Sequence, residues 1–337
     1  MSDPLAASAY APAHELDGVN QHMGELEMQL RLLLQACGLR HLAFYDRDRA
    51  ELFVAENLKP AKGVPAEQPS SSGLERAGRQ LFYILEELAP DFAELRTGSL
   101  IRTVVGVPEL GALVYQSVQP GFHLCCATPQ DRVNELIPRM TENIDVLRPT
   151  VRYGLLPRRS HLSRYMTLAA ESVKPPPAAA VPAATDTADS AESSAYTVES
   201  AADTPTELTD LLRTALHVDS LHYVAYYAAG APVCAADIFR HSALSTYFGG
   251  STTPQQRRDK YSLLGQLLPG VTHRMNTSLH ALMDGRIHQV VLNVEQGAVY
   301  FQHLEEDRYL LGVSLDHSRL AEADRHIERL MSGLVRD

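Results

Sequence analysis

Hydrophobic residues recur at helical spacing in three segments of each half of the chain. In the first half these apolar stripes predict helices over about 23–37, 74–88 and 130–147. Pro90 is expected to stop the second of them. Thr128 to Asp131 has the composition of a capping box at the start of the third. In the second half the stripes predict helices over about 208–215, 260–282 and 320–334, and Asp316 is expected to cap the last.

Strands are predicted between these helices, where apolar, aromatic and β-branched residues run together. In the first half they lie at about 41–46 and 50–56, and then at 99–107, 111–118 and 122–127. In the second half they lie at about 221–227 and 231–239, and then at 286–294, 298–304 and 308–315. Each half therefore reads helix, hairpin, helix, three-stranded meander, helix. Because strands such as "YLLGVSL" are apolar at most positions, helices are expected on both faces of the sheet.

The meanders of the two halves also share identities. Residues 101–116 and 287–302 align without a gap at an offset of 186 and agree at seven positions, where chance would give about one. The shared residues include a Val-Val pair and a Gly-Ala pair. The chain is therefore interpreted as an internal duplication.

A segment rich in Ala, Pro, Ser, Thr and acids separates the halves. Residues 174–205 contain almost nothing large to bury, so we expect a disordered tether there. The predicted organisation is a disordered N-terminus (1–18), a first domain (19–155), a linker with an Arg-rich start (156–204) and a second domain (205–337).

Composition narrows the functional class. The chain has a formal net charge of −11, and its sequence shows no strongly basic stretch of the kind that binds nucleic acid. The four cysteines lack zinc or disulfide spacing, which favours buried reduced thiols. Neither a signal peptide nor a membrane span is indicated, so a cytoplasmic location is expected.

The sequence contains no motif that indicates a catalytic, nucleotide-binding or metal site. The loop from Gly249 to Thr253 lacks the Gly-Lys-Ser/Thr ending of a P-loop, and a GxSxG elbow is absent. Histidines such as His222 and His288 have no carboxylate at metal-site spacing and are interpreted as packed or surface residues. We therefore expect no enzymatic activity, no catalytic or metal site and no cofactor.

The order and length of the predicted elements resemble the Roadblock/LC7 family. The residues that carry the resemblance are 287–330 and, more weakly, 101–137, with a glycine opening the middle meander strand. The resemblance implies an α+β fold with two α-β-β-α-β-β-β-α domains. Each domain would hold a five-stranded antiparallel sheet with helices on both faces.

The resemblance also implies a binding module whose domains pair through the first meander strand, with a helix from each domain beside the seam. Pairing of this kind satisfies an exposed sheet edge. Whether the two domains pair within one chain or between chains is left open. The residues expected at the interface are Ile101, Thr103, Val105, Leu81, Leu85, Ile287, Gln289, Val291, Leu264 and Leu268.

Bacterial Roadblock proteins of the MglB type regulate or scaffold small Ras-like GTPases, so the resemblance implies a protein partner of that kind. The alternative is a PAS- or GAF-like module that senses a small ligand, because those domains also combine an antiparallel sheet with helices. A sensor would keep its long helices outside the strands, whereas here a helix separates two strands from three. A hydrolase or transferase ranks third.

Overall fold

The structure is a computed structural model of residues 1–337. It describes residues 13–39, 41–47, 49–55, 71–95, 98–107, 111–154, 196–248, 252–280, 285–305 and 307–334. The Gly249-Gly250 loop tip and most of the predicted tether and N-terminus lie outside these ranges. Along the described ranges, no helix has the length and apolar character needed to cross a bilayer.

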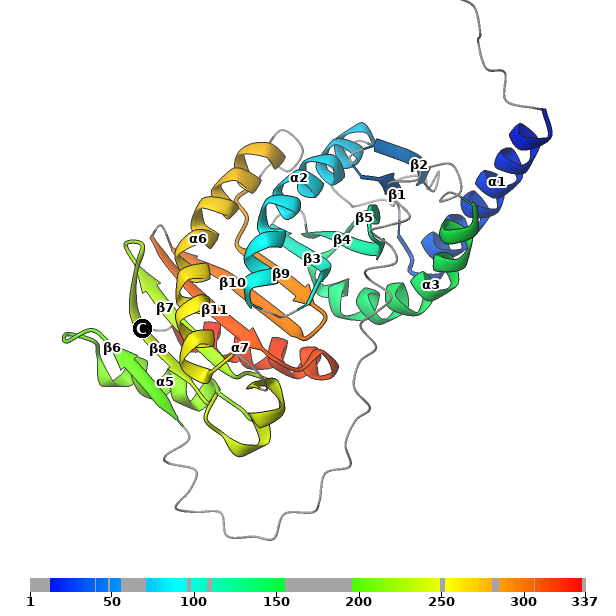
Figure 1. The fold of residues 1–337 in the computed structure, drawn as a ribbon. Coiled ribbons are helices and arrows are strands. Elements are labelled where there is room, and N and C mark those ends of the chain that lie inside the picture. The colour runs from blue at the N-terminus through cyan, green and yellow to red at the C-terminus, as the bar shows by residue number, and fades with distance from the viewer. Residues whose placement is uncertain are drawn as a thin grey trace, which may run out of the picture.

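The strands of both halves join in one antiparallel sheet (Figure 1). The first half contributes β1 (His41–Asp46), β2 (Arg49–Ala55), β3 (Leu100–Val107), β4 (Gly111–Gln119) and β5 (Phe122–Thr128). The second half contributes β7 (Tyr223–Ala228), β8 (Ala231–Asp237), β9 (Gln289–Val294), β10 (Gly297–Glu305) and β11 (Arg308–Ser314). With β6 (Thr197–Ser200) the order across the sheet is β2-β1-β5-β4-β3-β9-β10-β11-β7-β8-β6.

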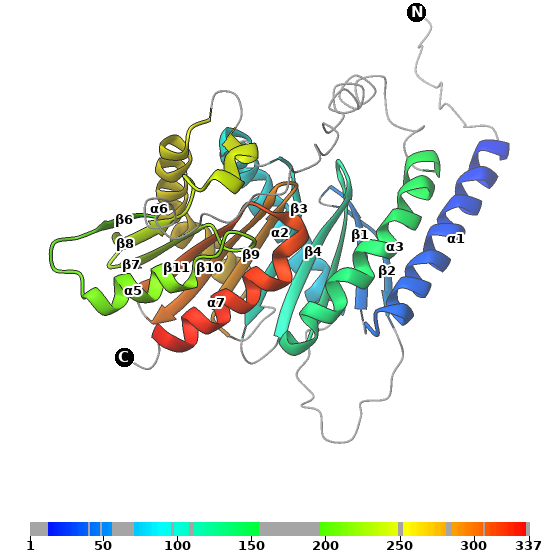
Figure 2. The ribbon, with the colours of Figure 1, turned by 90° about the horizontal axis from the view of Figure 1, so that it is seen from below.

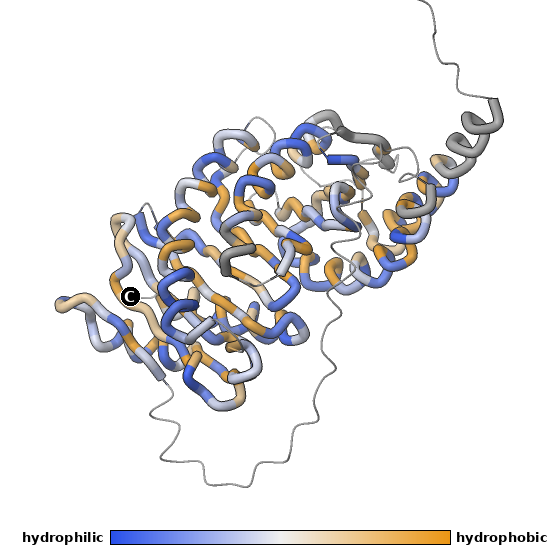
Figure 3. Tube along the Cα trace, viewed as in Figure 1, coloured by the Kyte–Doolittle hydropathy of each residue, from blue (hydrophilic) through white to orange (hydrophobic). Residues whose placement is uncertain are grey.

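Helices cover both faces of this sheet (Figure 2). One face carries α1 (Ala13–Ala36), α3 (Val133–Gly154), α5 (Thr206–Ala215) and α7 (Leu320–Leu334). The other face carries α2 (Ser71–Leu95) and α6 (Pro254–Leu279), which lie side by side. In Figure 3 the helices alternate between hydrophobic and hydrophilic residues, as expected for elements with one buried side. Each of the two apolar layers contains residues from both halves, so the hydrophobic core does not stop at the junction.

The α+β class is confirmed, but the expectation that each half forms its own five-stranded domain is corrected. The described strands form a single 11-stranded sheet, because β3 and β9 hydrogen-bond to each other. The extra strand, β6, lies inside the predicted disordered linker. It pairs with β8, which supplies backbone partners that composition cannot reveal. α1 begins at Ala13, inside the predicted disordered N-terminus.

Two helix boundaries differ from the predictions for identifiable reasons. α2 continues through Pro90 to Leu95, because Phe92 of its last turn is buried against the sheet. α6 starts at Pro254, six residues before the predicted 260. There Thr253 and Gln256 form a capping box with Pro at the first helical position. The similar Thr128 segment makes no such cap: a 3-10 turn (Gln130–Arg132) precedes α3 without a side-chain capping bond.

The duplication extends to the packing of α2 and α6. A constant offset of 187 residues takes Gly78 of α2 to Gly265 of α6. The same offset takes each of eight buried residues of α2 to a buried residue of α6. Tyr45 lies against Gly78 and donates its hydroxyl to the Glu75 carbonyl at 2.8 Å. Tyr227 lies against Gly265 in the same way and donates to the Ser262 carbonyl at 3.2 Å. The coinciding sets are Leu74, Ala77, Gly78, Leu81, Ile84, Leu85, Leu88 and Phe92, and Tyr261, Leu264, Gly265, Leu268, Val271, Thr272, Met275 and Leu279.

The Gly-Ala identity in the meanders has a backbone cause. Gly111 and Gly297 open β4 and β10 with φ of +99° and +123°, a region that side chains rarely adopt. A Cβ at Gly297 would lie 1.9 Å from the Ser314 carbonyl oxygen, and one at Gly111 would lie 2.3 Å from that of Thr128. Each half needs glycine here for the same close strand approach.

We expect Gly297→Ala to lower the free energy of unfolding by at least about 2 kcal/mol, because it combines backbone strain with a collision against main chain. Gly270→Ala is the matched control, since Gly270 lies in α6 and a Cβ added there would have no neighbouring atom within 4 Å. That change should stabilise by about 0.5–1 kcal/mol. Urea unfolding of both variants measures the difference, and equal effects would contradict the strain argument.

Candidate interaction site at the junction of the two halves

The junction is an antiparallel pairing of β3 with β9. Val104 lies opposite Val291, and Val105 lies opposite Val290. At the offset of 186, Val104 is equivalent to Val290 and Val105 to Val291. Each residue of the repeated Val-Val pair therefore faces the equivalent of its own neighbour. This is the register of a two-fold symmetric strand pair, so a pseudo-dyad passes between the two valine pairs.

The predicted interface residues on the strands lie at or beside this junction. Thr103, Val105 and Val291 are buried and pair across it, and Gln289 lies opposite Gly106. Gln289 also accepts a hydrogen bond at 2.8 Å from the side-chain amide of Gln130, which precedes α3. Ile101 lies in β3 at the irregularity between Leu100 and Arg102. Ile287 is buried just before β9.

The predicted interface residues on the helices lie in the apolar layer that the two halves share. Leu81 and Leu85 of α2, and Leu264 and Leu268 of α6, are buried in the layer between these helices and the sheet. They belong to one apolar cluster that spans both halves. Exposed residues also connect the two helices through an ion pair of Glu87 with Arg274.

A buried polar group crosses the junction on the opposite face, and the hydrophobic pattern did not single it out. Arg102 of β3 is 3% exposed, and its Nε donates to Asn293 Oδ1 of β9 at 2.9 Å. Gln116 of β4 lies beside it with its side-chain oxygen 3.5 Å from the guanidinium. An arginine inside a predicted strand is the sequence signal that could have located this group, since a buried charge requires partners.

Electrostatics extend this cluster to α7. Burial lowers the pKa of Arg102 to about 10, against the opposing influence of Asp324 and Tyr300. Burial likewise raises the pKa of Asp324 to about 6, although a hydrogen bond with Tyr300 and the charge of Arg102 act in the other direction. One cation from the first half thus depends on polar groups of β9, β10 and α7 in the second.

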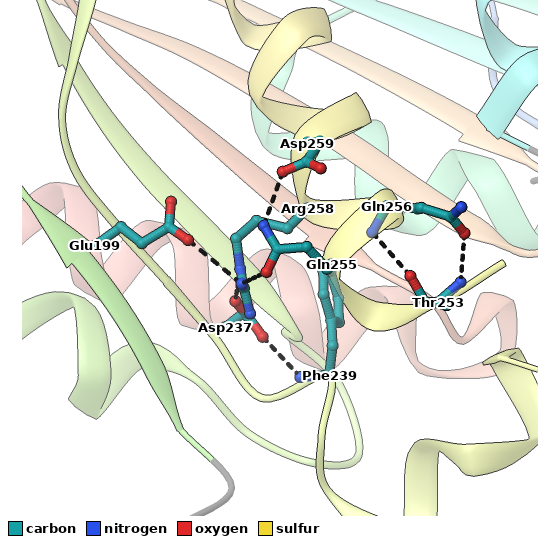
Figure 4. Close-up of polar contacts among 8 residues, drawn as sticks. All are labelled: Glu199, Asp237, Phe239, Thr253, Gln255, Gln256, Arg258 and Asp259. Atoms are coloured by element: carbon teal, nitrogen blue, oxygen red, sulfur yellow. Dashed lines mark hydrogen bonds and ion pairs between the residues drawn. The ribbon is translucent and has the colours of Figure 1, made fainter.

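A second polar cluster holds β6 at the far edge of the sheet (Figure 4). Arg258 of α6 donates from Nε to Asp237 Oδ2 at 2.5 Å, and both side chains are almost completely buried. The same guanidinium donates to Glu199 of β6 at 3.3 Å. Asp237 Oδ1 accepts from the Phe239 amide at 3.0 Å, so the carboxylate also shapes the chain after β8.

A pocket of about 560 Å³ lies beside this cluster, between β6, β8 and α6. Its lining includes Tyr223, Cys234, Arg258 and Leu263. The two carboxylates on Arg258 already satisfy much of its charge, so the geometry does not present a free cation to an anionic ligand.

The exposed face of α6 carries an apolar stripe at two positions that are polar in α2. Leu263 and Leu267 lie one turn apart and are 56% and 43% exposed. Their equivalents in α2 at the offset of 187 are Arg76 and Gln80, both exposed and polar. The two halves therefore share a buried side but present different surfaces.

His222 and the four cysteines lie where a structural role explains them. His222 is buried, its Nδ1 accepts from the Leu315 amide at 2.9 Å, and its Nε2 lies 2.9 Å from the Val218 carbonyl. Burial lowers its pKa to about 4, which keeps the ring neutral. Cys37, Cys125, Cys126 and Cys234 are buried and free. Within the described ranges no cluster of His, Cys, Asp and Glu is arranged to hold a metal.

No family model matches the chain, and no curated protein matches it either. Among solved structures it is similar to the gliding protein MglB from Thermus thermophilus, with 16% sequence identity and a TM-score of 0.30. The match covers 39% of this chain and 87% of that one. At this level of similarity it assigns no function.

The raised pKa of Asp324 predicts a pH-dependent stability. The folded state holds the proton of Asp324 more tightly than the unfolded chain does. The stability gained from this protonation is therefore fully present below about pH 4 and is lost as the pH rises through about 6. Asp324→Asn should therefore have a free energy of unfolding about 1–3 kcal/mol higher than the wild type at pH 8, measured by urea unfolding. The difference should shrink toward pH 4. Glu142→Gln, an exposed change on α3 that does not act on Asp324, is the control. An unchanged pH profile in Asp324→Asn would reject the assignment.

The Arg258 cluster predicts two very different mutational costs. Asp237→Ala leaves a buried guanidinium without its main partner and should cost about 3–5 kcal/mol. Glu199→Gln alters a carboxylate that is 59% exposed and should cost less than about 1 kcal/mol. Chemical unfolding compares the two. Adding Arg258→Met to Asp237→Ala should recover part of the loss, and a further loss would argue against an unpaired buried charge.

Proposed function

We propose that this chain is a non-enzymatic protein interaction module built as a dimer within one polypeptide, and that it regulates or scaffolds a small Ras-like GTPase or a related signalling complex in the cytoplasm. The observation that supports it is the β3–β9 pairing with α2 and α6 beside it on one face. That arrangement is the one the Roadblock/LC7 resemblance implied. The GTPase itself rests on that resemblance.

The physical mechanism is presentation of a rigid surface. The continuous sheet and its shared core fix α2 and α6 relative to each other, so a partner that contacts both helices meets preorganised groups and loses little free energy to ordering them. Rigid elements hold contact residues more accurately than loops do.

We assign the main partner contact to the apolar stripe of α6, Leu263 and Leu267. A partly exposed pair of leucines one turn apart is suited to an apolar anchor on another protein, whereas the polar Arg76 and Gln80 of α2 are not. The fold does not require leucine there, because the equivalent positions of the first half are polar and its helix packs against the sheet in the same way.

Ras-like GTPases from the same organism, purified and loaded with GTP, provide the test. We expect the wild-type chain to bind one of them and to change its rate of GTP hydrolysis or nucleotide exchange. Leu263→Arg with Leu267→Gln copies the first half onto the second and should weaken that binding at least about tenfold.

The matched control is Met28→Arg with Leu32→Gln on α1. These residues are also one turn apart, and both are 58% exposed, but they lie on the other side of the sheet. Their replacement should change binding by less than about twofold. Equal losses in both variants would reject the α6 surface, and no binding or rate change with any GTPase would reject the GTPase proposal.

The sensory alternative makes an opposite prediction in a thermal-shift assay. A PAS- or GAF-like sensor should gain several degrees in Tm with its ligand, because binding to the folded state stabilises it. We expect no such gain with nucleotides, haem or flavin, and a saturable rise in Tm would favour the sensor.

A further inference from the structure

One pair of equivalent positions meets where α2 contacts α6. The offset of 187 that superposes the buried residues of α2 on those of α6 takes Glu87 to Arg274. These two residues form an ion pair with each other. A residue that contacts its own equivalent must lie on the pseudo-dyad, which in the sheet passes between the two valine pairs. The pseudo-dyad therefore runs through both layers.

Opposite charges at this position distinguish unlike from like pairing. In a pair of two first halves, Glu87 would face Glu87, and in a pair of two second halves, Arg274 would face Arg274. The present pairing of unlike halves places the two charges in contact. Like charges in juxtaposition are a recognised means of rejecting a wrong partner.

The strand layer makes the same distinction with a buried group. Arg102 is satisfied by Asn293 of the other half. The equivalent of Asn293 in the first half is Val107, at the offset of 186. A pair of two first halves in this register would bury Arg102 beside valine, without its amide partner. Gln116 of its own half, 3.5 Å away, would be the partner left from this hydrogen-bonded group. Loss of a partner by a buried guanidinium is costly, so this layer opposes like pairing more strongly than the exposed ion pair does.

We infer that the two halves are specificity-matched to each other: Glu87 with Arg274, and Arg102 with Asn293, select pairing of a first half with a second half and reject pairing of identical halves. The partner that fits each junction edge is the other half of this polypeptide. This inference concerns the junction alone and does not depend on the proposed GTPase partner.

The test uses the full chain with a site-specific protease sequence inserted between residues 156 and 195, cut after folding. The two fragments are expected to stay together as a 1:1 complex. Arg274→Glu, or Glu87→Arg, should raise the dissociation constant of the cut complex about 3- to 10-fold, measured at several urea concentrations. The double variant with both charges exchanged should return to within about twofold of the wild type.

Like pairing is measured by mixing two cut proteins, one with a donor and one with an acceptor fluorophore on the first half. Energy transfer between first halves is expected to remain below about one tenth of that for unlike halves. It should increase when one of the first halves carries Glu87→Arg, because the two copies then present opposite charges. Circular dichroism of every variant checks folding, which these exposed substitutions should leave intact.

Three results would overturn the inference. They are like pairs that form as readily as unlike pairs, single charge reversals without effect on the dissociation constant, and a double exchange that sums the losses of the singles instead of cancelling them. The neutral variants Glu87→Gln and Arg274→Gln separate repulsion from lost attraction, since they should weaken the cut complex less than the reversals do.

Discussion

The backbone hydrogen bonds between β3 and β9 are the interaction on which the rest of the architecture depends. Each of these strands ends the sheet of its own half, and an unpaired strand edge invites association with another chain. Their mutual pairing satisfies both edges at once. It also places α2 beside α6 and lets one apolar layer run beneath both helices, so the halves share a core as well as a sheet. Separation of the strands would expose backbone groups and core residues together.

A junction of this kind would be stable with apolar residues alone, yet it contains a buried arginine. Replacing buried ion pairs by hydrophobic residues is often neutral or stabilising, so the Arg102 cluster is poorly explained as a source of stability. Asn293, Tyr300 and Asp324 come from the second half, and burial shifts the pKa values of Arg102 and Asp324 in directions that disfavour their charged forms. Buried charged and polar side chains destabilise the fold unless their hydrogen-bond partners are in place. The Arg102 cluster is therefore better explained as a means of fixing the register and the partner of β3.

Sequence reasoning located the repeated meander, the order of elements and the joining strands, because identities and apolar periodicity report directly on buried strands and helix faces. It missed β6, which is short, polar and stabilised by β8 and by Glu199 with Arg258, contacts between residues far apart in the chain. It also named Leu81 and Leu264 among the expected interface residues, and they lie in the apolar layer shared by both halves. Periodicity identifies a buried side without saying what buries it. The seam residues Glu87 and Arg274 are exposed and charged, so no hydrophobic pattern could mark them.

When the two halves are linked in one chain, equivalent positions can acquire different residues. In a symmetric homodimer every substitution appears twice, so a charge at the dyad always faces itself. In one chain the equivalent positions vary independently, and the tether supplies a high effective concentration that tolerates a moderately weak junction. The consequence is visible wherever the halves differ at matched positions: Glu87 and Arg274 are complementary, while Arg76 and Gln80 are polar where Leu263 and Leu267 are apolar. A duplicated module of this kind keeps the shared buried side that defines its fold and specialises its two exposed sides. It should therefore present one partner surface per chain where a homodimer would present two.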